Sequence, residues 1–581
     1  MKNTTLKRCY KLIKPHLKTI ALVSVISIII DLLTLTKPYL VKVVIDEFLS
    51  LGLAQKGFIT INTIGILYLF IVVTENVLDF FSRTKTNIMG EEILYTLRNK
   101  IYKYTQDANI SFHDKTPAGK LFARITSDVE DISALFKDVI VTIFKDAISI
   151  IAIIIMMLYF SWKLSLISFI VIPFVIITSI VLTIILNKIY DASKVVRTNI
   201  NTFLAESIYG IKLIKIFNIQ KEKQKECDDL TQEFIETRLP ASIFEGLFPG
   251  IMTLFENIAI TLIILSTINH WFGINNVEVG SIYIIVSYIK SLFEPINRTI
   301  DNIEIVQEAF VSMNKIFDIL DQKEFLEDFE SGIELADVQG KIEFKNVWFA
   351  YEKENWILKD ISFIINPGET IALVGKTGSG KTTITNLVNR FYDIQKGEIL
   401  LDGVNIKEIN KRSLRRNIGT ILQDPFIFAR SIRDNIRLNK KMTDSQILDA
   451  IELSSAKEFV DNLPNGIEEI AKERGESFSA GQKQLLAFAR IFAHNPNIFI
   501  LDEATANIDT YTENLIQKSI NKLSAEKTAI FIAHRLSTIV NVDKIIVLDK
   551  GSIVEQGNHN ELLKLDGYYA KLYKSYYESL G

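Results

Sequence analysis

Cysteine is almost absent from this chain of 581 residues, which contains only Cys9 and Cys227. We place both in segments on the cytoplasmic side of a membrane, so we expect a reducing compartment and no disulfide. The chain also lacks a basic stripe with interleaved aromatic residues, and its net charge is −3. We therefore expect no nucleic-acid partner. Low-complexity tracts and strong short repeats are missing as well.

Long apolar segments dominate the first half of the chain and are missing from the second. Apolar residues make up 48% of the sequence, and the mean hydropathy is +0.22 despite 23% charged residues. This mixture suggests a membrane portion joined to a soluble one. Six segments are long enough to cross a hydrocarbon core. They cover about residues 19–46, 58–81, 136–160, 162–189, 243–271 and 282–300.

The distribution of positive charge predicts the orientation of these spans. Residues 1–18 hold six Lys or Arg, and the connections 81–135 and 188–242 hold eight and nine. The opposite connections 47–57, 159–164 and 268–280 hold one, one and none. The positive-inside rule therefore places the N-terminus and both long connections in the cytoplasm. No small-residue cleavage site precedes Pro38, and the apolar run is too long for a signal peptide, so we expect residues 1–18 to be an amphipathic entry segment at the inner surface.

Both long connections keep a helical pattern, which predicts membrane helices extended into the cytoplasm. Short turns near residues 112–119 and 209–210 would join each pair of extensions. Residues 321–340 contain seven acidic residues and one lysine, a composition typical of a solvated linker. The predicted domains are therefore a six-helix membrane domain at residues 1–320, a linker at 321–340 and an α/β nucleotide domain at 341–581.

A phosphate-binding loop fits residues 375–382 at every fixed position. Its glycines allow consecutive backbone N–H groups to turn toward phosphate oxygens. Lys381 can reach the β- and γ-phosphates, and Thr382 can offer a hydroxyl to Mg²⁺. An apolar strand at 371–374 and a helix at 382–391 would flank the loop. This strand–loop–helix frame favours a phosphate-binding loop over the alternative, a glycine-rich turn without a ligand.

Two acids follow a second apolar strand, at residues 498–501. Asp502 would end this strand and could bind Mg²⁺, while Glu503 could polarise an attacking water. An ordinary strand end is the alternative interpretation. The phosphate-binding loop upstream makes that alternative weaker.

Together these motifs resemble an ATP-binding cassette (ABC) exporter half-transporter of the multidrug or lipid-exporter type. The resemblance covers nearly the whole chain, and its motifs follow the family's order. It implies that Gln423 belongs to the Q-loop and His534 is the switch histidine, both acting in catalysis with Glu503. Residues 111–128 resemble the family's first coupling segment, and residues 206–215 resemble the start of the second.

The resemblance also implies ATP and Mg²⁺ as cofactors. The residues implied to bind ATP are Tyr351, which would stack on adenine, Gly375, Lys376, Thr377, Gly378, Ser379, Gly380, Lys381, Thr382, Thr383, Ser479, Gly481, Gln482 and Asp509. Those implied to bind the metal are Thr382, Gln423 and Asp502.

Residues 478–482 stand where the family has its signature sequence, and they are expected to open a helix at 482–492. In the family, this segment holds the γ-phosphate bound by another subunit, so the resemblance implies a partner half-transporter. Phe478 replaces the usual leucine and Ala480 a glycine. The alanine adds a methyl group near phosphate and, if this position uses a positive φ, removes access to it. With the catalytic residues intact, this favours a heterodimer, and a homodimer is left open.

The transported substrate is not determined by the sequence. Drug, lipid and peptide export are all left open. Ionisable residues in membrane spans usually face a cavity or a partner group. Asp31 and Glu256 are the better candidates to contact a cationic substrate, against a role in packing. The alternative function is a membrane-anchored ABC ATPase that acts as a regulator or sensor without moving a solute.

Overall fold

The computed structural model describes residues 8, 12–49, 55–56, 59–271, 278–352, 354–502, 509–525, 527–532 and 539–578. The chain divides into two compact units. The membrane unit comprises residues 1–106 and 117–323, and the nucleotide unit comprises residues 107–116 and 324–581. A short stretch of the first long connection therefore belongs to the nucleotide unit. The domain boundaries predicted at residues 320 and 341 stay a prediction.

Six helices of the described residues are long and apolar enough to cross a membrane, which confirms the predicted number of spans. Helix α3 has 47 residues and is therefore about 70 Å long, well beyond a hydrocarbon core of about 30 Å. The long helices are α2 (Leu17–Val43), α3 (Ile61–Asp107), α7 (Val141–Phe169), α8 (Ile172–Tyr209), α10 (Gln220–Ile268) and α11 (Val279–Leu320). The short elements of this unit are η1 (Lys14–His16), η2 (Val44–Leu49), β1 (Gln55–Lys56), β2 (Ile59–Thr60), α5 (Ala118–Ile125), α6 (Ser127–Ala134), η3 (Leu135–Ile140) and α9 (Ile211–Ile216).

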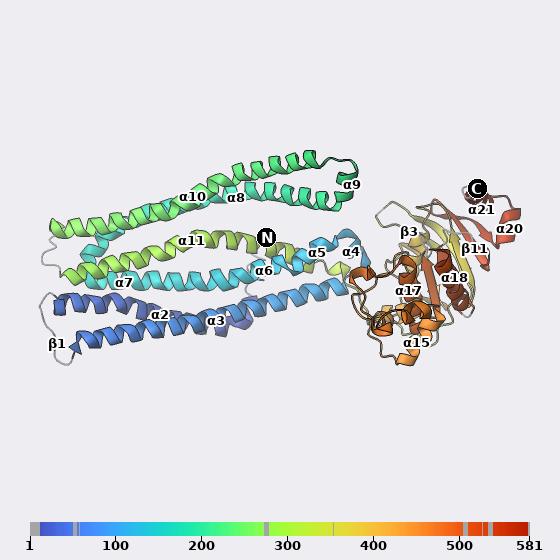
Figure 1. Cartoon of the computed structure of the whole chain (residues 1–581), viewed down its shortest axis with the longest axis horizontal. Helices are drawn as coiled ribbons and strands as arrows, with labels where there is room; N and C mark the ends of the chain where they lie inside the picture. Colours follow the sequence, from blue (N-terminus) through green and yellow to red (C-terminus); the bar gives the residue numbers. More distant parts are fainter. Residues whose placement is uncertain are drawn as a thin grey trace. The chain divides into compact units, whose positions relative to one another are not determined.

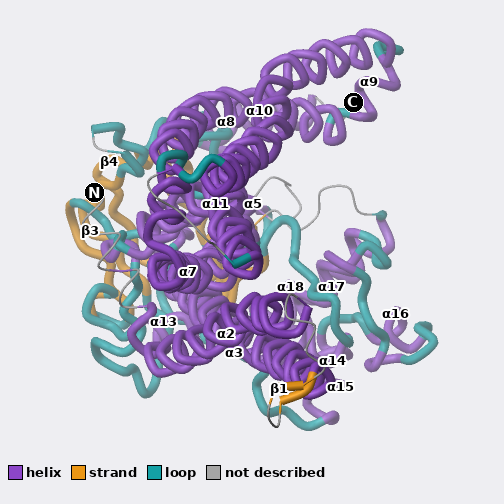
Figure 2. Tube along the Cα trace, turned by 90° about the vertical axis from the view of Figure 1, so that its left-hand side faces the viewer, coloured by secondary structure: helices purple, strands orange, loops and turns teal. Residues whose placement is uncertain are grey.

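Helices α8 and α10 run side by side, and α9 lies at the tip of the hairpin they form (Figure 1). The same hairpin is visible from another side (Figure 2). Inside the membrane unit, Tyr288 is fully buried, and its hydroxyl donates a hydrogen bond to the Leu35 carbonyl at 2.9 Å. Apolar residues on the outer surface of α3, such as Ile66 and Phe70, are exposed. An apolar outer surface is what a helix needs to face lipid.

The predicted break between the third and fourth spans was placed wrongly. We expected the break at residues 160–162, but α7 continues to Phe169 and α8 begins at Ile172. Ser161 has non-helical angles, φ −161° and ψ 96°, so the predicted break is a kink within the helix. The charge of Lys163 suggested a connection, but the chain turns at Ile170 and Val171, before Pro173 at the start of α8.

The nucleotide unit is built on a mostly parallel sheet. Its order is β12 (Ser552–Gly557), β11 (Lys544–Asp549), β5 (Thr370–Val374), β10 (Thr528–Ile532), β9 (Ile498–Asp502) and β8 (Ile418–Ile421). Only the edge strand β12 is antiparallel to its neighbour. Strands β5 and β10 are buried along their whole length, as expected for parallel strands covered on both faces. The α/β fold class is confirmed.

A second, antiparallel sheet has the order β4 (Leu358–Ile365), β3 (Ile342–Phe349), β6 (Lys396–Leu401) and β7 (Val404–Asn405). The helices of this unit are α4 (Ile110–Lys115), α12 (Lys381–Val388), α13 (Lys411–Arg416), α14 (Ile432–Arg437), α15 (Asp444–Leu453), α16 (Lys457–Asp461), α17 (Ala480–His494), α18 (Thr510–Ser524), α20 (His559–Lys564) and α21 (Tyr568–Glu578). Short helical turns are η5 (Lys323–Phe325), η6 (Gly466–Glu468) and η7 (Glu473–Gly475). Because the parallel strands share a direction, the loops at their carboxyl ends meet at one edge of the sheet.

Candidate nucleotide site

The predicted phosphate loop connects β5 to α12 at this edge. Strand β5 ends at Val374, and α12 begins at Lys381. Gly378 and Gly380 have φ values of +82° and +105°, which residues with a side chain rarely adopt. A Cβ atom at Gly380 would also lie 2.5 Å from Leu358 Cδ2. The loop therefore needs glycine at this position both for its backbone angle and for its contact with β4.

The polar groups of the loop fit a triphosphate. Lys381 is 5% exposed, and its Nζ donates hydrogen bonds to the carbonyls of Gly375 at 2.7 Å and Lys376 at 3.2 Å. Ser379 Oγ is buried and has no hydrogen-bond partner among the described residues. Leaving a buried hydroxyl without a hydrogen bond costs about 1–3 kcal/mol of folding free energy. The burial of Ser379 Oγ therefore indicates an acceptor supplied by a ligand. Of the other predicted loop residues, Thr383 is buried, whereas Lys376, Thr377 and Thr382 are exposed.

Further predicted residues follow neighbouring strands at the same edge. Asp502 is the last residue of β9, and Gln423 follows β8 and is exposed. Strand β10, between β5 and β9, ends at Ile532. Glu503 and His534 lie outside the described residues. The strand order thus brings the phosphate loop, Asp502 and Gln423 to one edge, although they are far apart in the sequence.

Tyr351, the predicted adenine platform, follows β3 and is 43% exposed. Its ring contacts Phe349 and Tyr392, with centroids 4.9 Å away in both cases. Its hydroxyl lies 3.3 Å from Thr383 Oγ1 and 3.4 Å from Asn386 Nδ2, both on α12. The ring is therefore placed next to the helix that follows the phosphate loop.

The signature segment forms the N-terminus of α17. Ser479 is the N-cap: its hydroxyl accepts from the Gln482 N–H at 3.2 Å, while the Gln482 side chain accepts from the Ser479 N–H at 2.9 Å. This capping box explains why the helix begins at Ala480, two residues before the predicted start. Phe478 is buried against Phe459, with ring centroids 5.4 Å apart. Gly481 is buried, and Gln482 is partly buried.

The backbone at Ala480 does not need a positive φ. Ala480 is the first residue of α17, where the backbone is helical and alanine is well accommodated. Position 480 therefore makes no use of a positive φ. Only the added methyl group distinguishes this position from glycine.

Asp509 is placed as the N-cap of α18. Its carboxylate accepts a hydrogen bond from the Thr512 N–H at 2.9 Å. This backbone hydrogen bond lowers the pKa of Asp509, so the side chain carries a negative charge at neutral pH. Asp509 is therefore both the last residue of the predicted D-loop and the residue that caps the following helix.

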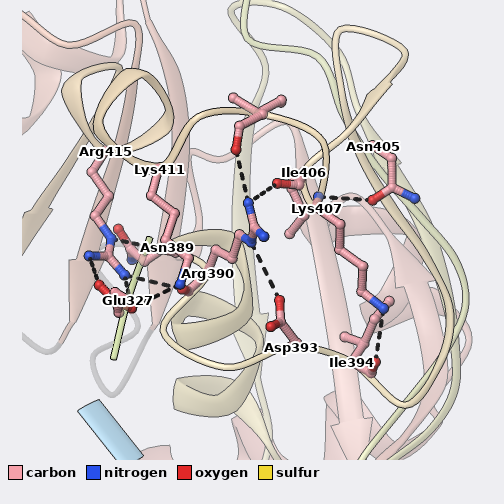
Figure 3. A network of polar contacts seen from close by, with 11 residues as sticks. Glu327, Asn389, Arg390, Asp393, Ile394, Asn405, Ile406, Lys407, Lys411 and Arg415 are labelled. Atoms are coloured by element: carbon pink, nitrogen blue, oxygen red, sulfur yellow. Dashed lines mark hydrogen bonds and ion pairs between the residues drawn. The ribbon is translucent and has the colours of Figure 1, made fainter. Parts of the chain in front are cut away.

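The acidic linker is anchored in the nucleotide unit through Glu327, a contact that sequence reasoning missed. Its Glu327 side chain is only 4% exposed and lies 2.7 Å from Arg415 and 3.2 Å from Lys411 (Figure 3). Arg415 also donates to the carbonyls of Asn389 and Arg390, just beyond α12. Burial alone would raise the pKa of Glu327. The hydrogen bonds and charges of Arg415 and Lys411 lower this pKa by more than burial raises it, so the net effect is a decrease. The expectation of a fully solvated linker is wrong at this residue, because two cations offset its burial.

Arg490 is a second residue that sequence reasoning missed. It lies on α17 and donates to the carbonyls of Phe426 and Asn435, both at 2.7 Å. Burial lowers the pKa of Arg490 to about 10, so it remains charged at neutral pH. Arg490 thus connects the signature helix to the segment that follows Gln423. The sequence feature that could have identified Arg490 is its position among apolar residues of a predicted helix, where a charged side chain needs polar partners.

Comparisons with known proteins agree with this arrangement. Residues 20–296 match the family description "ABC transporter transmembrane region", and residues 358–506 match "ABC transporter". The ATP-dependent lipid A-core flippase of Syntrophus aciditrophicus (strain SB) is 31% identical over 98% of this chain and 94% of that protein. YheH of Bacillus subtilis (strain 168), named a probable multidrug resistance ABC transporter ATP-binding/permease protein, is 36% identical over 84% of this chain and 72% of that protein.

The fold has a close counterpart among solved structures. A bacterial Atm1-family ABC exporter with ATP bound matches with a TM-score of 0.78, covering 97% of this chain and 98% of that one at 24% identity. Six membrane helices, a phosphate loop and a capped signature helix define a membrane-embedded P-loop ATPase. The chain belongs to the ABC transporter family. It is an ABC exporter half-transporter that couples ATP hydrolysis to transport.

Proposed function

We propose that this chain exports its substrate from the cytoplasm as one half of a dimer with two composite ATP sites. The observation that carries this proposal is the phosphate loop, whose buried Ser379 hydroxyl has no partner among the described residues. Tyr351 would stack on adenine and Lys381 would hold the β- and γ-phosphates. Ser479, Gly481 and Gln482 would contact the γ-phosphate bound by the partner chain.

The catalytic roles follow the order of the strands at the sheet edge. Glu503 would polarise the attacking water, and His534 and Gln423 would complete the site. Among the described residues, no group of three or more His, Cys, Asp or Glu could hold a metal. Mg²⁺ would be held by Thr382, Asp502 and Gln423 together with phosphate oxygens, since this ion is usually bound by few protein ligands and the substrate's phosphates.

A partner chain is also supported by the tip of the α8–α10 hairpin. Exposed apolar side chains gather there around α9: Ile208 is 71% exposed, Tyr209 90%, Ile216 78% and Phe217 67%. A cluster of this size on an exposed turn is typical of a docking surface. We propose that this tip contacts the nucleotide unit of the partner half-transporter.

The partner is proposed to be a different half-transporter. The site built on Lys381, Asp502 and Glu503 would then be the hydrolytic one. The opposite site, closed by the Ala480 signature of this chain, would turn ATP over slowly. A homodimer would instead have two identical sites.

A polar cavity in the membrane unit is the proposed contact for substrate. Its volume is about 260 Å³, and it lies among α2, α3, α7 and α11. Asp31 and Glu75 line it, whereas Glu256 does not. Glu75 is paired with Lys37 at 2.6 Å, so part of the negative charge is neutralised within the protein. Because Asp31 lines this cavity and Glu256 does not, we favour Asp31 over Glu256 as the residue that would face a cationic substrate.

The orientation is proposed from charge. The N-terminus and both long connections carry the Lys and Arg residues, so the nucleotide unit would lie in the cytoplasm of a cell whose cytoplasmic membrane holds the six spans.

Transport by inverted membrane vesicles tests this proposal. Vesicles that contain this chain and its partner should accumulate a fluorescent cation only with ATP, and vanadate should stop the uptake. Glu503→Gln should remove both uptake and hydrolysis, because Glu503 is the carboxylate proposed to polarise the attacking water. ATP hydrolysis without uptake of a cation, a lipid or a peptide would favour the regulator function instead.

A further inference from the structure

Tyr392 has no role in the proposed function, yet it lies directly beside the adenine platform. The rings of Tyr392 and Tyr351 meet edge to face, with centroids 4.9 Å apart and planes at 88°. Phe349, which is 1% exposed, makes edge contacts with both rings. Aromatic pairs have preferred relative orientations, so Tyr392 influences the direction in which Tyr351 presents its face.

The other contacts of Tyr351 are weak. Its hydroxyl is 3.3 Å from Thr383 and 3.4 Å from Asn386, near the upper limit for hydrogen bonds. A cavity of about 190 Å³ lies beside the two tyrosines, lined also by Asn109, Ser111, Gln395 and Lys411. Close packing therefore does not fix the tyrosine pair on that side. The orientation of the Tyr351 ring therefore depends on its ring contacts and on the group that holds Tyr392 in place.

Asp114 holds Tyr392. The Tyr392 hydroxyl donates a hydrogen bond to the Asp114 carboxylate at the end of α4, 278 positions earlier in the chain. Burial and this hydrogen bond raise the pKa of Tyr392, so its hydroxyl remains a donor at neutral pH. Asp114 itself is exposed, so we expect a modest energetic contribution from the pair.

The start of α4 is held separately, by the linker. The Asn109 N–H donates to the Phe325 carbonyl at 2.7 Å, and the Glu327 N–H donates to the Asp107 carbonyl at 2.8 Å. Through Glu327 and Arg415, these contacts reach the C-terminal end of α12, beyond the phosphate loop (Figure 3). Residues 107–116 are thus held by the linker at their start, while Asp114 reaches the tyrosine beside the adenine platform.

From these contacts we propose that Tyr392 and Asp114 are positioning residues that couple adenine binding to the first connecting loop, residues 107–116. This inference rests on the proposed stacking of adenine on Tyr351. The Asp114–Tyr392 bond orients Tyr392, whose ring edge orients Tyr351. By linkage, a bound adenine must stabilise the Asp114 contact as much as that contact stabilises adenine binding.

The test compares a ligand that has a base with one that has none. Calorimetry on the purified full chain measures the Kd of a non-hydrolysable imido analogue of ATP and that of inorganic tripolyphosphate. Tyr392→Phe and Asp114→Ala should each raise the Kd of the ATP analogue two- to tenfold, the effect of one hydrogen bond or ring contact. The Kd of tripolyphosphate should not change. The double variant should resemble either single variant, because both remove the same bond.

Hydrogen exchange of residues 107–116 gives a second measurement. The ATP analogue should slow exchange in the wild-type loop more than tripolyphosphate does, and Tyr392→Phe should remove this difference. Tyr568→Phe is the matched control, since it removes another tyrosine–aspartate hydrogen bond of the same unit, to Asp549 at 3.0 Å. It should alter neither Kd value.

The possible failures can be told apart. Unchanged Kd values in Tyr392→Phe and Asp114→Ala, with a weakened Tyr351→Ala, would overturn the positioning role alone. An unchanged Tyr351→Ala would overturn the adenine platform itself. Equal weakening of both ligands would show that Tyr392 serves only the fold of the unit, and would also overturn the inference.

Discussion

The two long connections between membrane helices differ in whether their turns are packed against the rest of the chain. The first contributes residues 107–116 to the compact nucleotide unit of its own chain. Within that stretch, Phe112 is 1% exposed, and the Asn109 side chain caps α4. The second connection turns at α9, where Ile216 and Phe217 are exposed. Yet both connections had looked alike in the sequence, being of similar length, basic and helical.

This difference indicates which connecting loop finds its contacts within one chain and which loop needs contacts from another. The first loop finds apolar and polar partners within the same chain, among them Phe325 and Tyr392. The second loop presents apolar side chains of the kind that proteins bury at interfaces. We infer that one chain supplies one loop to itself and the other loop to a partner.

The largest expected effect tests the chemistry that the first loop adjoins. Lys381→Ala should lower ATP hydrolysis by the purified complex by about 10²-fold or more, because the phosphate charge loses its main stabilising group. Lys359→Ala, at an exposed lysine on β4, is the control and should retain activity. Retention of more than about a tenth of wild-type hydrolysis by Lys381→Ala would contradict the phosphate-loop assignment.

The second prediction tests the opposite side of the comparison. Phe217→Glu places a charge in the proposed docking surface and removes a large apolar side chain, worth about 1.5–3 kcal/mol when buried. Hydrolysis by the complex should fall about tenfold or more, while binding of the ATP analogue by the chain stays unchanged. Leu565→Glu, at a residue that is 67% exposed like Phe217, is the matched control. Full activity of Phe217→Glu would show that the second loop does not need a partner.

The third prediction sharpens the role of the first loop's neighbour. Tyr351→Ala should weaken ATP binding by about 1–3 kcal/mol through the loss of stacking. Tyr351→Phe should restore binding, since the ring face and not the hydroxyl is used. Calorimetric Kd values for the two variants check this. A phenylalanine variant as weak as the alanine variant would indicate a hydrogen-bonding role for the hydroxyl.

The parts of this molecule that were predictable depend on neighbours in the sequence. The phosphate loop and the signature cap are defined within a few residues, and the spans follow from length and hydropathy. Contacts between distant positions were not predictable, because spacing carries no information about them. Asp114 and Tyr392 are one such pair, and Glu327 with Arg415 is another. The exposed tip at α9 is a third case, because its proposed partner lies outside the chain.

The fourth prediction concerns the linker that holds the first loop. Glu327→Gln should lower the free energy of unfolding of the nucleotide unit by about 2 kcal/mol, since Arg415 and Lys411 would keep a buried charge without its counterpart. Because the pKa of Glu327 is lowered in the folded state, its stabilisation is present above the ordinary value of 4.5 and is lost as the pH falls through the lowered value. The difference in melting temperature between variant and wild type should therefore shrink below about pH 4.5.

Glu334→Gln is the matched control for this measurement. Glu334 belongs to the same linker and pairs with Arg416 at 3.3 Å, but both side chains are exposed. An exposed pair contributes about 0–1 kcal/mol, so the control should melt close to wild type. Equal melting of the two variants would show that the burial of Glu327 does not anchor the linker.

The smallest expected effect is that of Ala480→Gly, which tests whether the partner that contacts the second loop is a different chain or a second copy of this one. Ala480 begins α17 with a helical backbone, so Ala480→Gly relieves no strain and removes only a methyl group near the proposed phosphate. In a heterodimer, that methyl group lies at the slowly hydrolysing site, and hydrolysis by the complex should change less than twofold. In a homodimer, the same change would alter both sites together. Steady-state hydrolysis by the chain alone and by the complex separates the two cases. Strong, cooperative hydrolysis by the isolated chain, with a marked response to Ala480→Gly, would rule out the heterodimer, and the second loop would then dock on a copy of its own chain.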